Sequence, residues 1–420
     1  MKILLVVKSK KMENLGVMYL SSIIKKEKHR CKIVSIDETI GMTRLWKPDV
    51  IGFSIMTGDQ ERFKNLHNQI MNMTVYNKKQ PKIIVGGPHP TFFPDDCDWA
   101  DTIAKGDAEE FIAEYIGASG TYDHIDKYPW PDRTDFRDES FMIRGIRDFI
   151  SSRGCPYNCA YCYNERWADM FPEHPRVRYR DPDDVVNEIA RVQPEWAYFQ
   201  DSCFGVSMGW LRKFAPRYAA SVNIPYHCHL RPSQATEDRV VLLVDSNCQS
   251  VRIALETGVQ RLRELIKRGK TSNEETLQAS KVLRKWNIDL MIQNILGLPT
   301  STIEDDLTTL EVNIRAMPAY AWCSIFQPYP GTELGELCKE KGWYKGDYSE
   351  ISDSFFDGSV LEFDPEHKEQ LVCLQKIFAL CVEVGYVPTV KELTIGNFPN
   401  LTHKIMRIQG DKRLFRGMNI

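Results

Sequence analysis

The sequence predicts an α/β protein in which a doubly wound, Rossmann-like domain precedes a partial (β/α)6 barrel and a small, mostly helical C-terminal segment. Short apolar runs alternate with amphipathic stretches over residues 1–118, which favours a parallel sheet with helices on both faces. Six further strand-like runs, separated by helical patterns, lie between residues 148 and 340, as in a curled parallel sheet. The 420 residues are enough for two or three domains.

The first domain, residues 1–118, is expected to contain four strands. They are the apolar runs 3–7, 31–36, 50–54 and 82–85. Two intervening segments, 16–26 and 60–72, carry apolar residues at helical spacing. Ligands of such sheets bind at the carboxyl ends of the strands, so the loops at residues 54–57 and 86–90 are candidate binding loops.

Residues 119–147 are expected to form a linker, because Tyr128-Pro-Trp-Pro-Asp-Arg133 has two prolines, flanking charges and little periodicity. The barrel is expected over residues 148–340. Its predicted strands are 147–151, 196–200, 226–230, 250–255, 289–295 and 321–327. Residues 341–420 are expected to close the barrel and contribute to the substrate pocket, with one amphipathic helix near residues 366–384.

The composition argues against nucleic-acid and membrane partners. The formal net charge is −3, which provides no strong field toward a polyanion. The opening residues read as a buried strand and not as a leader, and no apolar run reaches the roughly 18–20 residues of a membrane span. A cytoplasmic location is expected, and most of the twelve cysteines are expected to be buried thiols or metal ligands.

Three cysteines form the most informative motif, Cys155-Pro-Tyr-Asn-Cys159-Ala-Tyr-Cys162, expected directly after the first barrel strand. Thiolates are the usual ligands of Fe–S clusters. Three thiolates, in place of the four of a closed site, leave one iron open to another ligand. Gly154 and Pro156 suit a tight loop around a compact cluster. A zinc site without its fourth ligand and a coincidental spacing are the alternative interpretations.

This segment resembles the signature of the radical S-adenosylmethionine (SAM) superfamily, with Tyr161 in its aromatic position. Residues 1–340 resemble the class B enzymes of that superfamily, whose N-terminal domain binds cobalamin. The other matching segments are Asn14-Leu-Gly-Val-Met-Tyr-Leu20, Gly86-Gly-Pro-His-Pro-Thr91, Lys105-Gly-Asp-Ala-Glu109, the linker, Gln200-Asp-Ser-Cys-Phe204, Leu255-Glu-Thr-Gly258, Gly297-Leu-Pro299 and Pro328-Tyr-Pro-Gly-Thr332. The resemblance implies an oxygen-sensitive [4Fe–4S] cluster held by the three cysteines, with SAM and cobalamin as further cofactors.

By the same resemblance, the open iron would take the amino and carboxylate groups of SAM, and reduction would cleave SAM to a radical. The implied SAM contacts are Tyr161 beside the adenine, Asp201 and Ser202 at the amino group, Glu256, Thr257 and Gly258 at the ribose and methionine, and Gln293 and Gly297 near the adenine or the reacting centre. Two alternatives remain open: Asp201 and Glu256 as helix caps, and Gly297 as a turn former.

Two histidines flank Cys228 on a predicted strand. Alternation places His227 and His229 on one face and Cys228 on the other. We interpret the histidines as a substrate-facing or structural pair, in preference to a second metal site. Cys373 and Cys381 fit helical spacing and are expected in the core.

The cobalamin contacts are implied by the resemblance alone. Many cobalamin proteins supply a cobalt-binding histidine from the loop after the first strand, but residues 8–16 contain none. Ser54 and Thr57 would lie under the corrin or near its nucleotide tail. Gly86 and Gly87 would let the backbone approach the tail closely. His89 would contact the tail, with cobalt ligation as the less favoured alternative.

The leading functional hypothesis is a cobalamin-dependent methyltransferase that acts on an unactivated carbon of a polar small molecule. It would draw electrons from an external reductant such as flavodoxin or ferredoxin. The first alternative is a radical SAM enzyme on the same scaffold that rearranges, couples or oxidises its substrate. The second alternative is a non-catalytic cobalamin or redox sensor.

Overall fold

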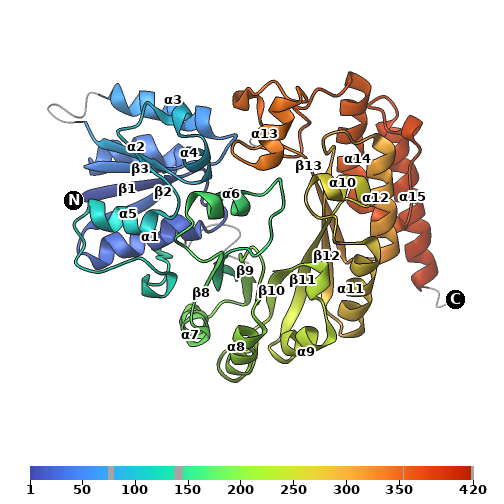
Figure 1. The fold of residues 1–420 in the computed structure, drawn as a ribbon, viewed down its shortest axis with the longest axis horizontal. Coiled ribbons are helices and arrows are strands. Elements are labelled where there is room, and N and C mark those ends of the chain that lie inside the picture. Colours follow the sequence, from blue (N-terminus) through green and yellow to red (C-terminus); the bar gives the residue numbers. More distant parts are fainter. Residues whose placement is uncertain (74–79, 137–144, 353, 418–420) are drawn as a thin grey trace. The chain divides into compact units, whose positions relative to one another are not determined.

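The computed structural model describes residues 1–73, 80–136, 145–352 and 354–417 (Figure 1). Residues 137–144 of the predicted linker therefore lie outside the described residues. The chain divides into two compact units. The first contains residues 1–156 and 163–202, and the second contains residues 157–162 and 203–420.

The N-terminal sheet is parallel and five-stranded, in the order β2-β1-β3-β4-β5. Its strands are β1 (Lys2–Val7), β2 (Arg30–Ser35), β3 (Val50–Ser54), β4 (Lys82–Gly86) and β5 (Thr102–Ala104). All four predicted strands are confirmed. The fifth was missed because three residues are too few to show a pattern. Strand β2 ends at Ser35, whose backbone and side chain form a capping box with Glu38 at the start of the next helix.

Helices cover both faces of this sheet. Alternate residues of β1 face opposite ways: Ile3 and Leu5 belong to the core beneath α1 (Leu15–Lys26) and α5 (Ala108–Tyr115). Leu4 and Val6 belong to the core on the other side, which contains Phe63 and Leu66 of α3 (Gln60–Met71). Helix α2 (Ile36–Trp46) and the short α4 (Pro88–Phe92) complete the domain. The predicted doubly wound arrangement is confirmed (Figure 1).

The second sheet has six strands in the order β13-β12-β11-β10-β9-β6, the sequential order of a partial (β/α)6 barrel. They are β6 (Ile146–Phe149), β9 (Trp196–Phe199), β10 (Tyr226–Leu230), β11 (Cys248–Glu256), β12 (Asp289–Leu296) and β13 (Tyr320–Ile325). One expectation was wrong: the cysteine motif does not follow the first barrel strand directly. A second short strand, β7 (Ser152–Gly154), intervenes and pairs antiparallel with β8 (Val177–Tyr179).

Helices alternate with these strands and continue to the C-terminus. They are α6 (Tyr163–Met170), α7 (Pro182–Val192), α8 (Met208–Ser221), α9 (Glu237–Asp245), α10 (Gln260–Leu265), α11 (Asn273–Lys285), α12 (Ile303–Ala316), α13 (Glu333–Glu340), α14 (Pro365–Val384) and α15 (Phe398–Gly417). Helix α14 matches the predicted amphipathic helix, and Cys373 and Cys381 lie in its core face as expected. Among the described residues, no helix is long and apolar enough to cross a membrane.

Candidate cofactor sites

The loop that carries the cysteines begins at a glycine that no other residue could replace. Gly154 has a φ of +89°, and a Cβ there would collide with the carbonyl oxygen of Arg176. This close approach is fixed by the β7–β8 pairing, in which Gly154 lies opposite Val177. The requirement for glycine therefore has a steric cause, and it directs the chain sharply into Cys155.

Within the second unit, the loop is fastened on both sides. The Ala160 N–H donates to the Ile266 carbonyl at 3.2 Å, and the Ala160 carbonyl accepts from Leu334 N–H at 2.8 Å. Cys159 is buried, whereas Cys155 and Cys162 are half-buried. In the described part of the chain, no three Cys, His, Asp or Glu side chains gather closely enough to hold a metal ion together, so the ligand assignment stays a prediction. The donor set itself, three thiols on one short loop, fits an Fe–S cluster.

Tyr161, Glu256 and Arg268 form a buried polar cluster beside Cys159. The Tyr161 hydroxyl donates to Glu256 Oε1 at 2.5 Å. Arg268 Nη1 lies 3.9 Å from both Glu256 Oε1 and Cys159 Sγ. Burial raises the pKa of the Glu256 carboxyl, and Arg268 and Tyr161 oppose that rise. The cluster therefore places a carboxyl that accepts from Tyr161 and the Arg268 guanidinium next to the Cys159 sulfur.

Glu256 has the strained backbone that often marks a functional position. Its φ is +64°, and the pairing of β11 with β12 shifts register between Ala254 and Glu256. A non-glycine residue in this conformation costs about 1–3 kcal/mol. The alternative role as a helix cap is wrong, because α10 is capped by Val259.

The residues after Glu256 pack tightly against α12. The Gly258 N–H donates to Thr309 Oγ1 at 3.0 Å, and a Cβ on Gly258 would lie 3.0 Å from the Thr308 carbonyl. The Thr257 hydroxyl, 3.4 Å from that of Thr309, is buried with them. These contacts hold the end of β11 against α12.

Gly297 and Gln293 occupy different environments on β12 and its exit. Gly297 has a φ of +64°, and its N–H donates to the carboxylate of Asp306, with nitrogen–oxygen distances of 3.2 and 3.3 Å. This geometry supports the turn-forming alternative for Gly297. Gln293 is half-buried and lies opposite Ala254 and Trp322 in the sheet.

Asp201 acts on the segment that precedes Cys155. Its carboxylate is fully buried and accepts from the Ser151 N–H at 2.9 Å, the Ser151 hydroxyl at 2.6 Å and the Ser152 hydroxyl at 2.6 Å. Burial raises its pKa, and these hydrogen bonds oppose the rise. Asp201 does not cap α8, whose N-cap is Ser207. The neighbouring Ser202 hydroxyl accepts from Asn164 at 3.2 Å.

The N-terminal domain contains a cavity of about 350 Å³ between its sheet and the α1–α5 face. Of the predicted cobalamin contacts, Ser54, Gly86 and Gly87 line it. Gly87 has a φ of +102°, and a Cβ there would lie 2.8 Å from the Ile55 carbonyl. Apolar walls with exposed glycine backbone fit a planar, mostly apolar group such as the nucleotide base of cobalamin.

One end of the cavity carries a charged group that the sequence pattern did not single out. Arg153, two residues before Cys155, lies 2.5 Å from Glu109 and 3.2 Å from Asp107. All three line the cavity. The Lys105-Gly-Asp-Ala-Glu109 motif thus holds the residue at the entrance to the cysteine loop. The resemblance drew attention to the 105–109 segment. Its contact with Arg153 could not be predicted from the sequence, because 44 residues separate Glu109 from Arg153.

Thr57 and His89 lie together in a buried hydrogen-bond chain. The Thr57 hydroxyl lies 3.0 Å from His89 Nδ1 and 3.3 Å from the Tyr163 hydroxyl. His89 Nε2 lies 3.1 Å from Asp96. Tyr163 also stacks on Phe92, with ring centroids 4.4 Å apart. Both nitrogens of His89 are engaged, so this geometry opposes cobalt ligation and gives His89 the role of fixing Thr57. Burial lowers its pKa.

The loop after β1 is anchored at several points, and its last residue, Asn14, also lines the cavity. Asn14 caps α1, accepting from Val17 N–H at 3.1 Å. Lys8 pairs with Asp59 at 2.9 Å. The buried Glu13 carboxylate accepts from the Asp148 N–H at 2.8 Å and from Arg133. This loop contains no histidine, and its Glu13 carboxylate ties it to Arg133 of the linker.

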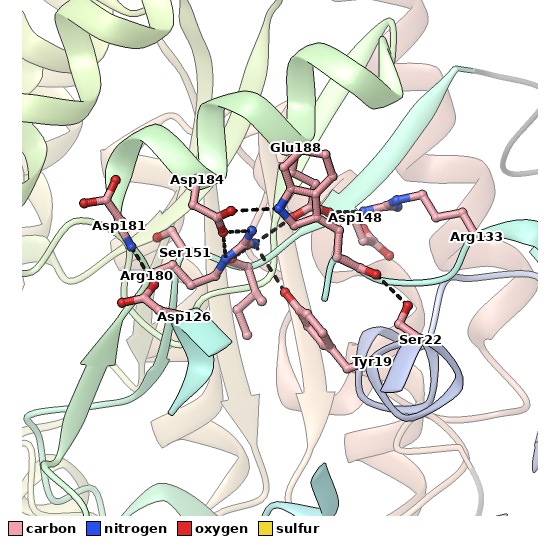
Figure 2. A network of polar contacts seen from close by, with 12 residues as sticks. Tyr19, Ser22, Asp126, Arg133, Asp148, Ser151, Arg180, Asp181, Asp184 and Glu188 are labelled. Carbon is pink, nitrogen blue, oxygen red and sulfur yellow. Dashed lines mark hydrogen bonds and ion pairs between the residues drawn. The ribbon is translucent and has the colours of Figure 1, made fainter. Parts of the chain in front are cut away.

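The predicted linker is held by a buried ionic network (Figure 2). Arg133 pairs with Glu13 and with Glu188 of α7, the latter at 2.9 Å. Arg180 pairs with Glu188 at 2.7 Å and with Asp184 at 2.5 Å. The Tyr19 hydroxyl accepts from Arg180 at 3.2 Å. Trp130 of the linker donates its ring N–H to Asp184 at 2.8 Å. The Trp130 carbonyl accepts from the Ser22 hydroxyl at 2.5 Å. The described part of the linker is thus a structural element of the first unit.

Comparisons with known proteins agree with this fold. Residues 1–116 match the family model of the B12 binding domain, and residues 149–312 match that of the Radical SAM superfamily. The chain is 22% identical over 374 residues to an uncharacterized methyltransferase of Pyrococcus horikoshii, covering 77% of each chain. It is 26% identical over 282 residues to a tRNA-2-methylthio-N(6)-dimethylallyladenosine synthase of Sulfurihydrogenibium, covering 62% of each chain.

Among solved structures, the chain resembles the radical SAM methyltransferase TsrM of Kitasatospora setae with cobalamin and a [4Fe–4S] cluster bound. The TM-score is 0.64 at 16% sequence identity, and the match covers 81% of this chain and 78% of that one. At this identity the likeness shows a shared fold.

Proposed function

Because the chain belongs to the radical SAM enzymes that carry an N-terminal B12-binding domain, we propose that it is a cobalamin-dependent methyltransferase acting on an unactivated carbon of a polar small molecule. The observation that carries this proposal is the presence, in one chain, of the three-cysteine loop and of a B12-binding domain with a glycine-floored cavity. A methyltransferase among the relatives and TsrM among the structural neighbours support the same reaction class.

The protein's residues would hold the cofactors in two places. Cys155, Cys159 and Cys162 would bind the cluster, with Arg268 balancing the charge at Cys159. Glu256, held by Tyr161, would accept a hydrogen bond from SAM. When bound, the cluster with SAM supplies a radical that removes hydrogen from carbon, and cobalamin supplies the methyl group.

In the first unit, some residues would bind cobalamin, and others would fix the backbone that leads into the cysteine loop. The cavity lined by Ser54, Gly86 and Gly87 would take the nucleotide tail, and the Thr57–His89 contact would fix the loop under the corrin. Asp201 holds Ser151 and Ser152, and so limits the motion of the strand that leads to Cys155. A rigid backbone before Cys155 would hold the cluster and SAM in a fixed position relative to the substrate.

The test is product analysis under strictly anaerobic conditions, with reconstituted cluster, cobalamin, SAM and a flavodoxin or ferredoxin reductant. We expect both S-adenosylhomocysteine and 5′-deoxyadenosine to form. Cys159→Ala should abolish 5′-deoxyadenosine formation. Formation of 5′-deoxyadenosine without S-adenosylhomocysteine would favour the non-methylating alternative, and formation of neither would favour the sensor.

A further inference from the structure

Strands β10–β13 have one face packed on helices and an opposite face that, apart from the buried His227, is half-buried. On the packed side, Leu296 and Ile325 belong to a core with Leu371 and Phe378 of α14. Side chains at alternate positions point the other way. We call this side the inner face. It consists of His227, His229, Ser250, Arg252, Met291, Gln293 and Trp322.

Three aromatic rings gather at the β13 edge of the inner face. The Trp322 ring lies 5.6 Å from that of Phe355 and 5.9 Å from that of Phe356, and the two phenylalanine rings are 4.7 Å apart. Their segment is fastened to the end of β13, because Ile325 N–H donates to the Phe355 carbonyl at 2.9 Å. Phe355 and Phe356 are nevertheless 38% and 36% exposed. A fixed, exposed group of rings offers a surface for a planar apolar ligand.

The middle of the inner face is polar and basic. Arg252 stands between His229 and Met291 on the neighbouring strands. His227 Nδ1 lies 2.6 Å from the Ser250 hydroxyl, and burial, assisted by Arg252, lowers the pKa of His227 to about 3, so its ring is neutral near pH 7. Acidic residues of these strands stand only at the two ends of this side, Asp289 at the start of β12 and Glu256 at the end of β11.

The register sets the distance between the basic and aromatic parts. Trp322 lies opposite Gln293, and Gln293 lies opposite Ala254, two residues beyond Arg252. Two strand spacings and one two-residue step place the Cα atoms of Arg252 and Trp322 about 12 Å apart. Side chains of these lengths leave room for one fused ring with a short acidic side chain.

We propose that the inner face is the substrate site, and that its substrate is a planar aromatic carboxylate whose ring packs on Trp322, Phe355 and Phe356 and whose carboxylate pairs with Arg252. This inference rests on the proposed function and names the substrate class of that reaction. The neutral His227, with His229 and Gln293, would contribute hydrogen bonds between the two ends of the ligand.

The test is calorimetric titration of the full chain, with its cluster reconstituted, using indole-3-acetate and its uncharged analogue indole-3-acetamide as probes. We expect the acid to bind at least tenfold more tightly than the amide. Arg252→Gln should reduce that preference to within twofold, and Trp322→Ala should weaken binding of the acid at least tenfold. The matched control is Trp286→Ala. Trp286 lies at the C-terminal end of α11 and its ring N–H donates to Glu237 of α9, so its loss should not change the affinity for the acid.

Equal affinity of the unaltered protein for acid and amide, or binding of neither at millimolar concentration, would overturn the inference without any variant. An unchanged acid affinity in Trp322→Ala would also overturn it. The proposed function is tested separately, by 5′-deoxyadenosine and S-adenosylhomocysteine formation in the unaltered protein. If neither product forms but the acid still binds selectively, the methyltransferase proposal is overturned and the proposed aromatic-carboxylate site stands.

Discussion

At the scale of single residues, two polar side chains are held in ways that their neighbours in sequence do not explain. Glu256 adopts a positive φ and is buried against Tyr161 and Arg268. His89 is buried between Thr57 and Asp96. Each arrangement gives a direct expectation for a single substitution.

Glu256→Gln should weaken SAM binding and spare the cluster. The amide keeps the shape and an oxygen that can accept from Tyr161, but it replaces the second oxygen, an acceptor, with a donor group. Hydrogen bonds to charged groups contribute about 1.5–3 kcal/mol, so we expect a rise in the SAM dissociation constant of roughly tenfold or more. Equilibrium dialysis measures the affinity and iron analysis measures the cluster. Glu264→Gln, on the exposed side of α10, is the control, and an equal effect of both variants would contradict the role of Glu256.

His89→Ala should leave the cobalt coordination unchanged and weaken cobalamin binding. Both nitrogens of His89 are engaged by Thr57 and Asp96, so the side chain acts on the loop and not on the metal. Electron paramagnetic resonance of bound cob(II)alamin reads nitrogen ligation directly. A nitrogen splitting that is present in the unaltered protein and lost in His89→Ala would show that His89 is a cobalt ligand.

At the scale of elements, the antiparallel β7–β8 pair and the linker shape the entry to the cysteine loop. The pairing of β7 with β8 and the ion pairs that hold the linker were not readable from the sequence. Strands β7 and β8 have three residues each, too few for an alternation pattern. The linker lacks periodicity because side-chain ion pairs, and not apolar spacing, hold it.

Gly154→Ala should lower the iron content of the protein severely, because the added Cβ meets the carbonyl of Arg176, the residue just before the partner strand β8. Gly117→Ala is the matched control. Gly117 has a φ of +66°, but a Cβ added there would have no neighbouring atom within 4 Å, so it tests the backbone cost, about 1 kcal/mol, without the collision. Equal iron content in the two variants would show that the collision has no consequence for the loop.

Arg133→Met should destabilise the first unit by about 3–5 kcal/mol, since it leaves the buried carboxylate of Glu13 without its cation. Arg176→Met breaks a more exposed pair with Glu165 and should cost at most about 1 kcal/mol. Urea denaturation of both variants gives the comparison. A loss for Arg133→Met no larger than that for Arg176→Met would mean that the network in Figure 2 contributes little to stability.

At the scale of the whole molecule, hydrophobic patterning predicted the fold because both sheets consist of short apolar runs that alternate with amphipathic helices. Strand β10 matches its predicted bounds, and the order of the barrel strands follows the sequence. Contacts between segments far apart in the sequence could not be predicted. Tyr161 meets Glu256 across 95 residues, and Arg268 carries no motif of its own. The aromatic group at Trp322 depends on a C-terminal segment without any recognisable pattern.

The central claim is that this chain binds cobalamin as well as an iron–sulfur cluster, and the most direct test is a joint measurement of both. The protein is prepared anaerobically with cobalamin supplied and freed of unbound corrin by gel filtration. Its visible spectrum and iron content are then recorded. We predict about one cobalamin and four irons per chain. A full complement of iron with no bound corrin would contradict the account, because the N-terminal domain would then serve some purpose other than cobalamin binding.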